Sequence, residues 1–375
     1  MENPFIIKSY ESKELFCDRE EELQLMLRNC INHSDMTLIS QRRMGKTGLI
    51  LRLFDELHDT RPDIHTIYLD IFSSRNIDDF IKLLAEAALK AFRQQTTIGD
   101  RLMNFIKSLR PQFTFDSITG DPQLQIAYQT AHEKEYTLKG LLDFLDSQNV
   151  HIVMAIDEFQ QIREYPEQKM EALLRTYIQQ THHITFIFCG SKKHIMADIF
   201  ANEKKPFYSS TAFISLDKIT AESYSAFIKR LFNDNQRSIT EEAVQFILEW
   251  TRRHTYYTQQ LCHTVFANGA QAITIEDVKM ACEQLMKQGE AVYLQYRQML
   301  TDKQWNYLIA IAKETAVSQI TASAFLSKYN IGTPSASRRL ADALREKGLL
   351  NDEITLEGTS YNVSDVFLSH WMERL

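Results

Sequence analysis

The eight residues 40–47, Ser-Gln-Arg-Arg-Met-Gly-Lys-Thr, constrain the fold of this chain more than any other segment. They follow a short apolar run, which predicts a buried strand, and lead into a stretch where apolar residues recur at helical spacing. In such a turn Gly45 lets backbone N–H groups converge on an anion, and the helix N-terminus attracts negative charge. Lys46 then reaches the terminal phosphates, and the Thr47 hydroxyl binds Mg²⁺. The sequence therefore predicts a phosphate-binding loop.

The loop departs from the usual pattern G-x-x-x-x-G-K-[ST] at its first position, where Ser40 replaces glycine. Serine fits a positive-φ position less well than glycine, so an ordinary strand-to-helix turn is the alternative interpretation. Arg42 and Arg43 cannot both point into one tight turn. Each either contacts phosphate or forms a structural ion pair with an acid such as Glu22.

Two carboxylates follow the buried apolar strand predicted at 152–156. Asp157 and Glu158 come directly after this strand, and ligands of parallel sheets bind at the carboxyl ends of the strands. Asp157 is expected to hold Mg²⁺ through water, opposite Thr47, and Glu158 to orient or deprotonate the attacking water. A solvated acidic loop is the alternative.

A further apolar strand, predicted at 184–189, ends in Gly190 and Ser191. We expect the Ser191 hydroxyl to sense the γ-phosphate or the attacking water. The alternative is that these two residues simply form a turn.

The order of the predicted elements indicates an α/β fold followed by helices. Near-continuous apolar strands separated by helices indicate a parallel sheet covered on both faces. Residues 94–121 show no clear pattern, so no element is predicted there. Strands are predicted at 37–39, 65–70, 150–156, 184–189 and 212–216. Helices are predicted afterwards at 221–232, 240–250, 258–266 and 275–286.

The C-terminal part has the element order of a winged helix-turn-helix. Helices predicted at 301–313, 322–329 and 335–347 precede a hairpin around Glu357 and Gly358. We therefore expect a P-loop NTPase domain at 1–217, with a parallel sheet flanked by helices, a helical lid domain at 218–290 and a winged-helix-like domain at 291–375.

Composition restricts the classes of function. The formal charge is −7, from 42 Lys+Arg and 49 Asp+Glu, which argues against binding held mainly by nucleic-acid phosphates. The five cysteines are odd in number and form no CxxC pair, so they predict reduced thiols rather than disulfides or a zinc site. No signal pattern occurs, and no apolar stretch approaches the roughly 20 residues that span a bilayer. We expect a cytoplasmic protein without a membrane partner.

Several segments, taken in order, resemble the archaeal-type ATPases, a branch of the AAA+ and STAND P-loop NTPases. The resemblance covers nearly the whole chain. Its most specific parts are the loop, which is similar to the family's G-x-R-R-x-G-K-T, and the segment 156–160, which is similar to its Walker B motif. Weaker similarities lie at 3–5, 16–23, 189–191, 206–208 and 253–257.

The resemblance implies ATP or ADP with Mg²⁺ as the bound cofactors. It implies nucleotide contacts from Ser40, Gln41, Arg42, Arg43, Met44, Gly45, Lys46, Thr47, Gly48, Arg19 and Thr255. Lys46, Glu158 and Ser191 are the expected catalytic residues, and Thr47 and Asp157 the expected metal ligands. The family's N-terminal glycine is replaced by Asp18, an arginine by Ser210 and an adenine-facing proline by Thr255. Loss of the arginine implies slow hydrolysis, or nucleotide binding used mainly as a switch.

The sequence thus favours a slow ATPase that acts as an ATP-driven switch. We expect a protein partner, whose identity the sequence does not give, and oligomer formation stays open. One alternative is a DNA-binding regulator that uses Arg338, Arg339 and Lys347 on the last predicted helix. We favour a solvated or protein-binding face there. The other alternative is a nucleotide-bound scaffold that does not hydrolyse ATP.

Overall fold

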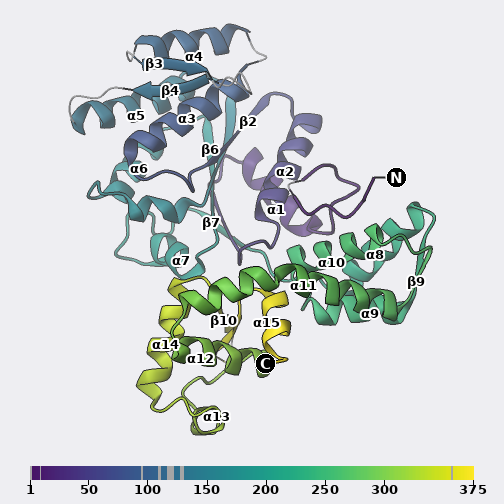
Figure 1. The fold of residues 1–375 in the computed structure, drawn as a ribbon. Coiled ribbons are helices and arrows are strands. Elements are labelled where there is room, and N and C mark those ends of the chain that lie inside the picture. Colours follow the sequence, from purple (N-terminus) through teal and green to yellow (C-terminus); the bar gives the residue numbers. More distant parts are fainter. Residues whose placement is uncertain are drawn as a thin grey trace. The chain divides into compact units, whose positions relative to one another are not determined.

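The computed structural model describes residues 2–8, 10–93, 96–108, 111–115, 122–126, 131–355 and 358–375 (Figure 1). The chain divides into two compact units. Residues 9–218 form the first unit, and residues 1–8 together with 219–375 form the second. The first unit contains the large sheet, and the second is mainly helical.

The first unit is built on a five-stranded sheet in the order β2-β5-β6-β1-β7, and its strands all run parallel. The strands are β1 (Met36–Ile39), β2 (Ile64–Asp70), β5 (His151–Asp157), β6 (Ile184–Gly190) and β7 (Ala212–Ser215). β1 and β6 are buried at every residue, as their apolar runs indicated. The predicted parallel sheet is confirmed, and the carboxyl ends of its strands share one edge.

Helices cover both faces of this sheet. They are α1 (Glu20–Ile31), α2 (Lys46–Thr60), α3 (Ile77–Ala91), α4 (Thr96–Ser108), α5 (Ala131–Asp146), α6 (Met170–Ile178) and α7 (Lys193–Ala201), with the 3₁₀ helix η1 (Phe159–Glu164). Successive strand residues point to opposite sides. Val153 and Ala155 therefore join an apolar cluster with α1 and α2, whereas Ile152, Met154 and Ile156 join a cluster with α3, α5, α6 and α7 (Figure 1).

The segment 94–121, for which the sequence predicted no element, contains regular structure where it is described. After α4, β3 (Pro111–Phe115) pairs with β4 (Pro122–Ile126) in an antiparallel hairpin that is separate from the large sheet. These strands mix polar and apolar residues, so they lack the continuous apolar run that identifies a strand buried on both faces.

The second unit starts with four helices. They are α8 (Ala221–Asp234), α9 (Glu241–Trp250), α10 (Thr255–Ala267) and α11 (Ile275–Met299), with the short parallel strands β8 (Ser238–Ile239) and β9 (Ala272–Ile273). The four predicted helices are confirmed, but α11 continues well past Met286, where the pattern predicted its end. A Cβ at Gly289 would lie only 2.3 Å from the Tyr293 side chain, so this glycine lets tyrosine pack closely inside a continuous helix.

The C-terminal elements follow the order predicted for a winged helix. They are α12 (Asp302–Lys313), α13 (Ser323–Lys328), α14 (Pro334–Glu346), β10 (Leu350–Thr355), β11 (Gly358–Val363) and α15 (Val366–Met372). β10 and β11 are antiparallel, and the predicted turn residue Glu357 lies outside the described residues. Phe367 is 4% exposed and packs against Trp250, with ring centroids 5.2 Å apart, so it is a core aromatic. The division of this unit into a lid and a winged helix at residue 290 stays a proposal.

All five cysteines are free and buried. Burial raises the pKa of Cys30 and of Cys282 to about 12, so these thiols stay protonated and unreactive. Among the described helices, not one is both long enough and apolar enough to cross a membrane.

Candidate functional site

The loop between β1 and α2 has the backbone conformation of an anion-binding turn. Gly45 and Arg43 take left-handed conformations, with φ of 95° and 61°, and this alternation turns successive N–H groups to one side. No side chain caps the N-terminus of α2, and its first turn contains no acidic residue. By contrast, Asn76 caps α3 by accepting a hydrogen bond from Asp79 N. The start of α2 is therefore available to an anion from outside.

Ser40 fits the loop without a positive φ, so glycine is not required at this position. Its side chain is fully buried, and its hydroxyl donates to Gln41 O at 2.9 Å. Lys46 Nζ lies 3.2 Å from Ser40 Oγ, 3.5 Å from Ser40 O and 3.4 Å from Gln41 O. The serine thus supplies an extra acceptor that holds the lysine against the loop.

Lys46 is 6% exposed. Burial lowers the pKa of its ammonium, and the charges of Asp157 and Glu158 oppose this shift. The loop carbonyls and the Ser40 hydroxyl satisfy the ammonium, so it is already placed at the mouth of the turn that would receive a phosphate.

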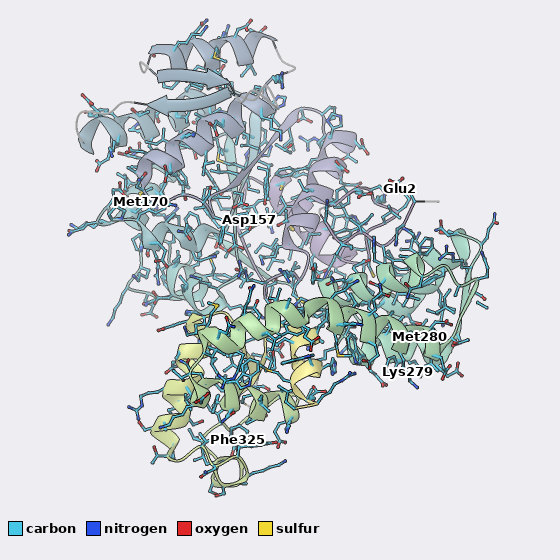
Figure 2. All side chains as sticks on the ribbon, viewed as in Figure 1. Glu2, Asp157, Met170, Lys279, Met280 and Phe325 are labelled. Atoms are coloured by element: carbon cyan, nitrogen blue, oxygen red, sulfur yellow. The ribbon has the colours of Figure 1, made fainter. Side chains whose placement is uncertain are left out.

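Asp157, which is labelled in Figure 2, lies at the carboxyl end of β5. It is only 4% exposed. Its Oδ2 accepts hydrogen bonds from the hydroxyls of Thr47 and Tyr68, each at 2.8 Å. Its Oδ1 accepts one from Glu158 N at 2.9 Å. The structure therefore brings together the threonine and the aspartate that the sequence proposed as metal ligands. A hydroxyl and a carboxylate are oxygen ligands of the kind Mg²⁺ prefers.

Glu158 follows in a left-handed conformation, with φ of 54°. Its Oε2 accepts hydrogen bonds from the Ser191 hydroxyl at 3.0 Å and from the Gln160 amide. A Cβ at Gly190 would lie 2.4 Å from Gln160 Oε1, so a larger residue here would displace the Gln160 side chain from the end of β6. Glu158 and Ser191 therefore meet at the same edge as Lys46 and Asp157.

Sequence reasoning missed three residues at this edge. Tyr68, Asp70 and Gln160 all contact or adjoin the two acids. Asp70 is the register partner of Asp157 in the neighbouring strand. Burial, together with the charges of Asp157 and Glu158, raises the pKa of Asp70, while a hydrogen bond from Phe72 N opposes the shift. The sequence did contain a signal for two of them. Tyr68 and Asp70 lie at the end of the strand predicted at 65–70, and in a parallel sheet this end lies at the same edge as Asp157.

The remaining loop residues have other contacts. Arg42 is exposed and lies over the Phe72 ring, 6.0 Å from its centroid, and Arg43 is exposed as well. Glu22, the acid named as a candidate partner for these arginines, accepts a 2.8 Å hydrogen bond from Arg19.

Three residues expected at the nucleotide lie in other surroundings. Arg19 is 6% exposed and also donates to Asp217 O at 2.5 Å, so it fastens α1 to the last residues of the first unit. Gly48 packs against Phe16, where a Cβ would come within 3.0 Å of the ring. Thr255 begins α10 and belongs to the second unit. Their nucleotide contacts stay predictions.

Two family models match the chain. Residues 16–261 match the model described as an ATPase domain predominantly from Archaea. Residues 291–374 match the model described as "Probable winged helix domain". A search of curated proteins found no match.

Solved structures of archaeal proteins are similar over nearly the full length. The Walker-type ATPase PABY2304 of Pyrococcus abyssi has a TM-score of 0.67 at 17% identity, over 99% of this chain and 100% of that chain. The ORC2 protein of Aeropyrum pernix, in its ADPNP–ADP complexes, has a TM-score of 0.60 at 14% identity, over 99% and 96%. The ORC1 protein of Aeropyrum pernix, in complex with DNA, has a TM-score of 0.54 at 12% identity, over 96% and 92%. These likenesses confirm the predicted P-loop NTPase fold with a C-terminal winged helix.

Proposed function

Because the chain belongs to the family of ATPase domains found predominantly in Archaea, we propose that it binds ATP with Mg²⁺ and hydrolyses it slowly, as a nucleotide-controlled switch. The observation that supports this most strongly is the 2.8 Å hydrogen bond between Thr47 and Asp157 beside a buried Lys46. A lysine, a hydroxyl and a carboxylate at the carboxyl edge of a parallel sheet are the groups that bind a triphosphate and its metal.

Each residue has a distinct role in this proposal. Lys46 and the N–H groups of the loop bind the phosphates, and Thr47 and Asp157 hold the metal. Bound Mg²⁺ would neutralise charge that develops on the phosphates. Glu158 orients the attacking water and accepts its proton, and Ser191 fixes the Glu158 carboxylate through their 3.0 Å hydrogen bond.

One feature supports slow turnover. Ser210, at the place of the family's arginine, donates its hydroxyl to Phe207 O at 2.7 Å and brings no positive charge. At Glu158, Ser191 and Gln160 both donate to Oε2, so the attacking water would use Oε1.

The direct test is phosphate release by the purified full chain with ATP. We expect turnover that requires Mg²⁺ and stays well below the median enzyme rate of about 10 s⁻¹. Chelation of the metal should stop it. Absence of Mg·ATP binding would contradict the proposal, whereas binding without turnover would favour the scaffold function instead.

DNA binding by the winged helix is the second candidate, because Arg338 and Arg339 are exposed on α14. The charges nearby oppose it. Asp352 and Glu353 lie on β10 of the wing, and Asp352 forms an ion pair with Arg345 of α14 at 3.0 Å. Residues 291–374 contain as many acidic as basic side chains, so this region has no excess of positive charge for phosphates.

We therefore expect duplex DNA to bind more weakly than about 10⁻⁴ M at physiological salt, the weak end of non-specific binding. Fluorescence anisotropy with labelled duplex at several salt concentrations measures this. The double change Arg338→Ala and Arg339→Ala should leave the signal unaltered. Tight binding that falls with salt, and that this double change removes, would make DNA recognition the better account.

A further inference from the structure

The carboxylate of Asp157 has more hydrogen-bond donors than the loop motif accounts for. Thr47, on the loop side, and Glu158 N, along the chain, are donors that any strand-end aspartate next to such a loop can have. The third donor, Tyr68, comes from the neighbouring strand β2. We propose that Tyr68 is a positioning residue, whose hydroxyl fixes the Asp157 carboxylate so that Asp157 and Thr47 hold Mg²⁺ together. This inference rests on the function proposed above.

The register of the sheet explains why this tyrosine reaches the site. Tyr68 is opposite Ala155 in the pairing of β2 with β5, and Asp70 is opposite Asp157. Alternate residues share a face, so Tyr68 points to the same face as Ala155 and Asp157. Tyr68 packs against the apolar cluster of α1 and α2, and the first turn of α2 carries Thr47. The ring thus lies beside the helix while its hydroxyl reaches the end of the next strand.

The two hydroxyls share one oxygen of the carboxylate. Thr47 and Tyr68 both donate to Oδ2, while Glu158 N donates to Oδ1, so the plane of the carboxyl group is determined from three directions. At 4% exposure a carboxylate needs such donors, because burial of an unpaired charge is costly. Tyr68 is the donor that depends on neither the loop nor the residue that follows Asp157.

The hydroxyl of Tyr68 remains a donor at any physiological pH. An ordinary tyrosine hydroxyl has a pKa of about 10, so it carries its proton at neutral pH. Tyr68 donates this hydrogen to Oδ2 of Asp157 at 2.8 Å. A group that orients a metal-binding carboxylate in this way typically contributes about 10- to 100-fold to metal affinity or activity.

The change Tyr68→Phe removes the hydroxyl and keeps the ring. We expect the Mg²⁺ concentration that half-saturates ATP binding to rise about 10-fold. ATP affinity in the presence of EDTA should not change, because Lys46 and the loop N–H groups bind the phosphates without Tyr68. A purely structural role would not separate these two quantities.

Tyr165 provides a matched control in the same unit. It is 7% exposed, and its hydroxyl shares a 2.5 Å hydrogen bond with Ser74 Oγ. The change Tyr165→Phe therefore also removes one tyrosine hydrogen bond, but none to Asp157. Its effect on the unfolding temperature shows how much of any change at Tyr68 comes from stability alone.

The experiment titrates Mg²⁺ into full-length wild type, Tyr68→Phe and Tyr165→Phe at a fixed concentration of a fluorescent ATP analogue, and repeats the nucleotide titration in EDTA. A shifted Mg²⁺ curve for Tyr68→Phe alone supports the inference. It is overturned if Tyr68→Phe titrates like wild type, or if Tyr165→Phe shifts the curve equally. If wild type itself shows no Mg²⁺-dependent binding, the proposed function fails, and that result is distinct from a failure at Tyr68.

Discussion

Replacing Lys46 with alanine is expected to abolish measurable ATP binding. The ammonium is the buried positive charge of the loop, held 3.2 Å from Ser40 Oγ at the turn that would receive the phosphates. Hydrogen bonds to charged groups contribute about 1.5–3 kcal/mol each, and 3 kcal/mol corresponds to roughly a 150-fold loss of affinity. Removal of this charge also leaves the Asp157 and phosphate charges to repel each other. Isothermal titration calorimetry with Mg·ATP measures the loss.

Lys139→Ala is the matched control for this change. Lys139 is a basic residue of the same unit, but it lies on α5 and its ammonium pairs with Asp143 at 2.6 Å. We expect this variant to keep the affinity of wild type. Because Lys46 is buried, the unfolding temperature of both variants must be measured too. Wild-type affinity in a folded Lys46→Ala variant would contradict the proposed phosphate site.

Replacing Glu158 with glutamine should stop ATP turnover and leave ATP binding intact. The amide cannot accept a proton from the attacking water, and loss of a general base typically lowers the rate about 10²- to 10⁴-fold. The amide oxygen can still accept hydrogen bonds from Ser191 and Gln160, so the local structure should persist. Phosphate release and nucleotide affinity, measured on the same preparation, separate the two effects.

Glu164→Gln controls for the loss of one negative charge. Glu164 ends η1 and lies 3.9 Å from Lys192 in a largely exposed ion pair, so its neutralisation should not affect turnover. Equal turnover by wild type and Glu158→Gln would contradict the assignment of Glu158 as the base. If neither protein releases phosphate but both bind ATP, the chain is a nucleotide-bound scaffold.

The parts of the fold that were predictable from sequence depend on local patterns. The loop was recognisable because Gly45, Lys46 and Thr47 lie between an apolar run and a helical repeat. Residues of these types at this spacing typically bind phosphate. Asp157 and Glu158 were recognisable because they end a strand that is apolar on both faces. Both signals lie within a few consecutive residues.

The missed parts depend on pairing between distant segments. The position of Tyr68 next to Asp157 follows from β2 lying beside β5, and apolar periodicity does not reveal which strands are neighbours. Gln160 acts at Glu158 because glycine at 190 leaves room for it, which is a tertiary contact. The contacts of Arg19 with Glu22 and with Asp217 O, which is 198 residues away in sequence, likewise depend on the tertiary structure.

The central claim is that the loop at 40–47 and the carboxylates at the end of β5 share one triphosphate and its metal. The most direct test is a crystal structure of the Glu158→Gln variant with ATP and Mn²⁺, whose anomalous scattering locates the metal. We predict phosphates against the loop N–H groups and Lys46, with the metal within about 2.2 Å of Thr47 Oγ1 and on the side of Asp157. A nucleotide bound elsewhere, or a metal remote from both residues, would contradict the account.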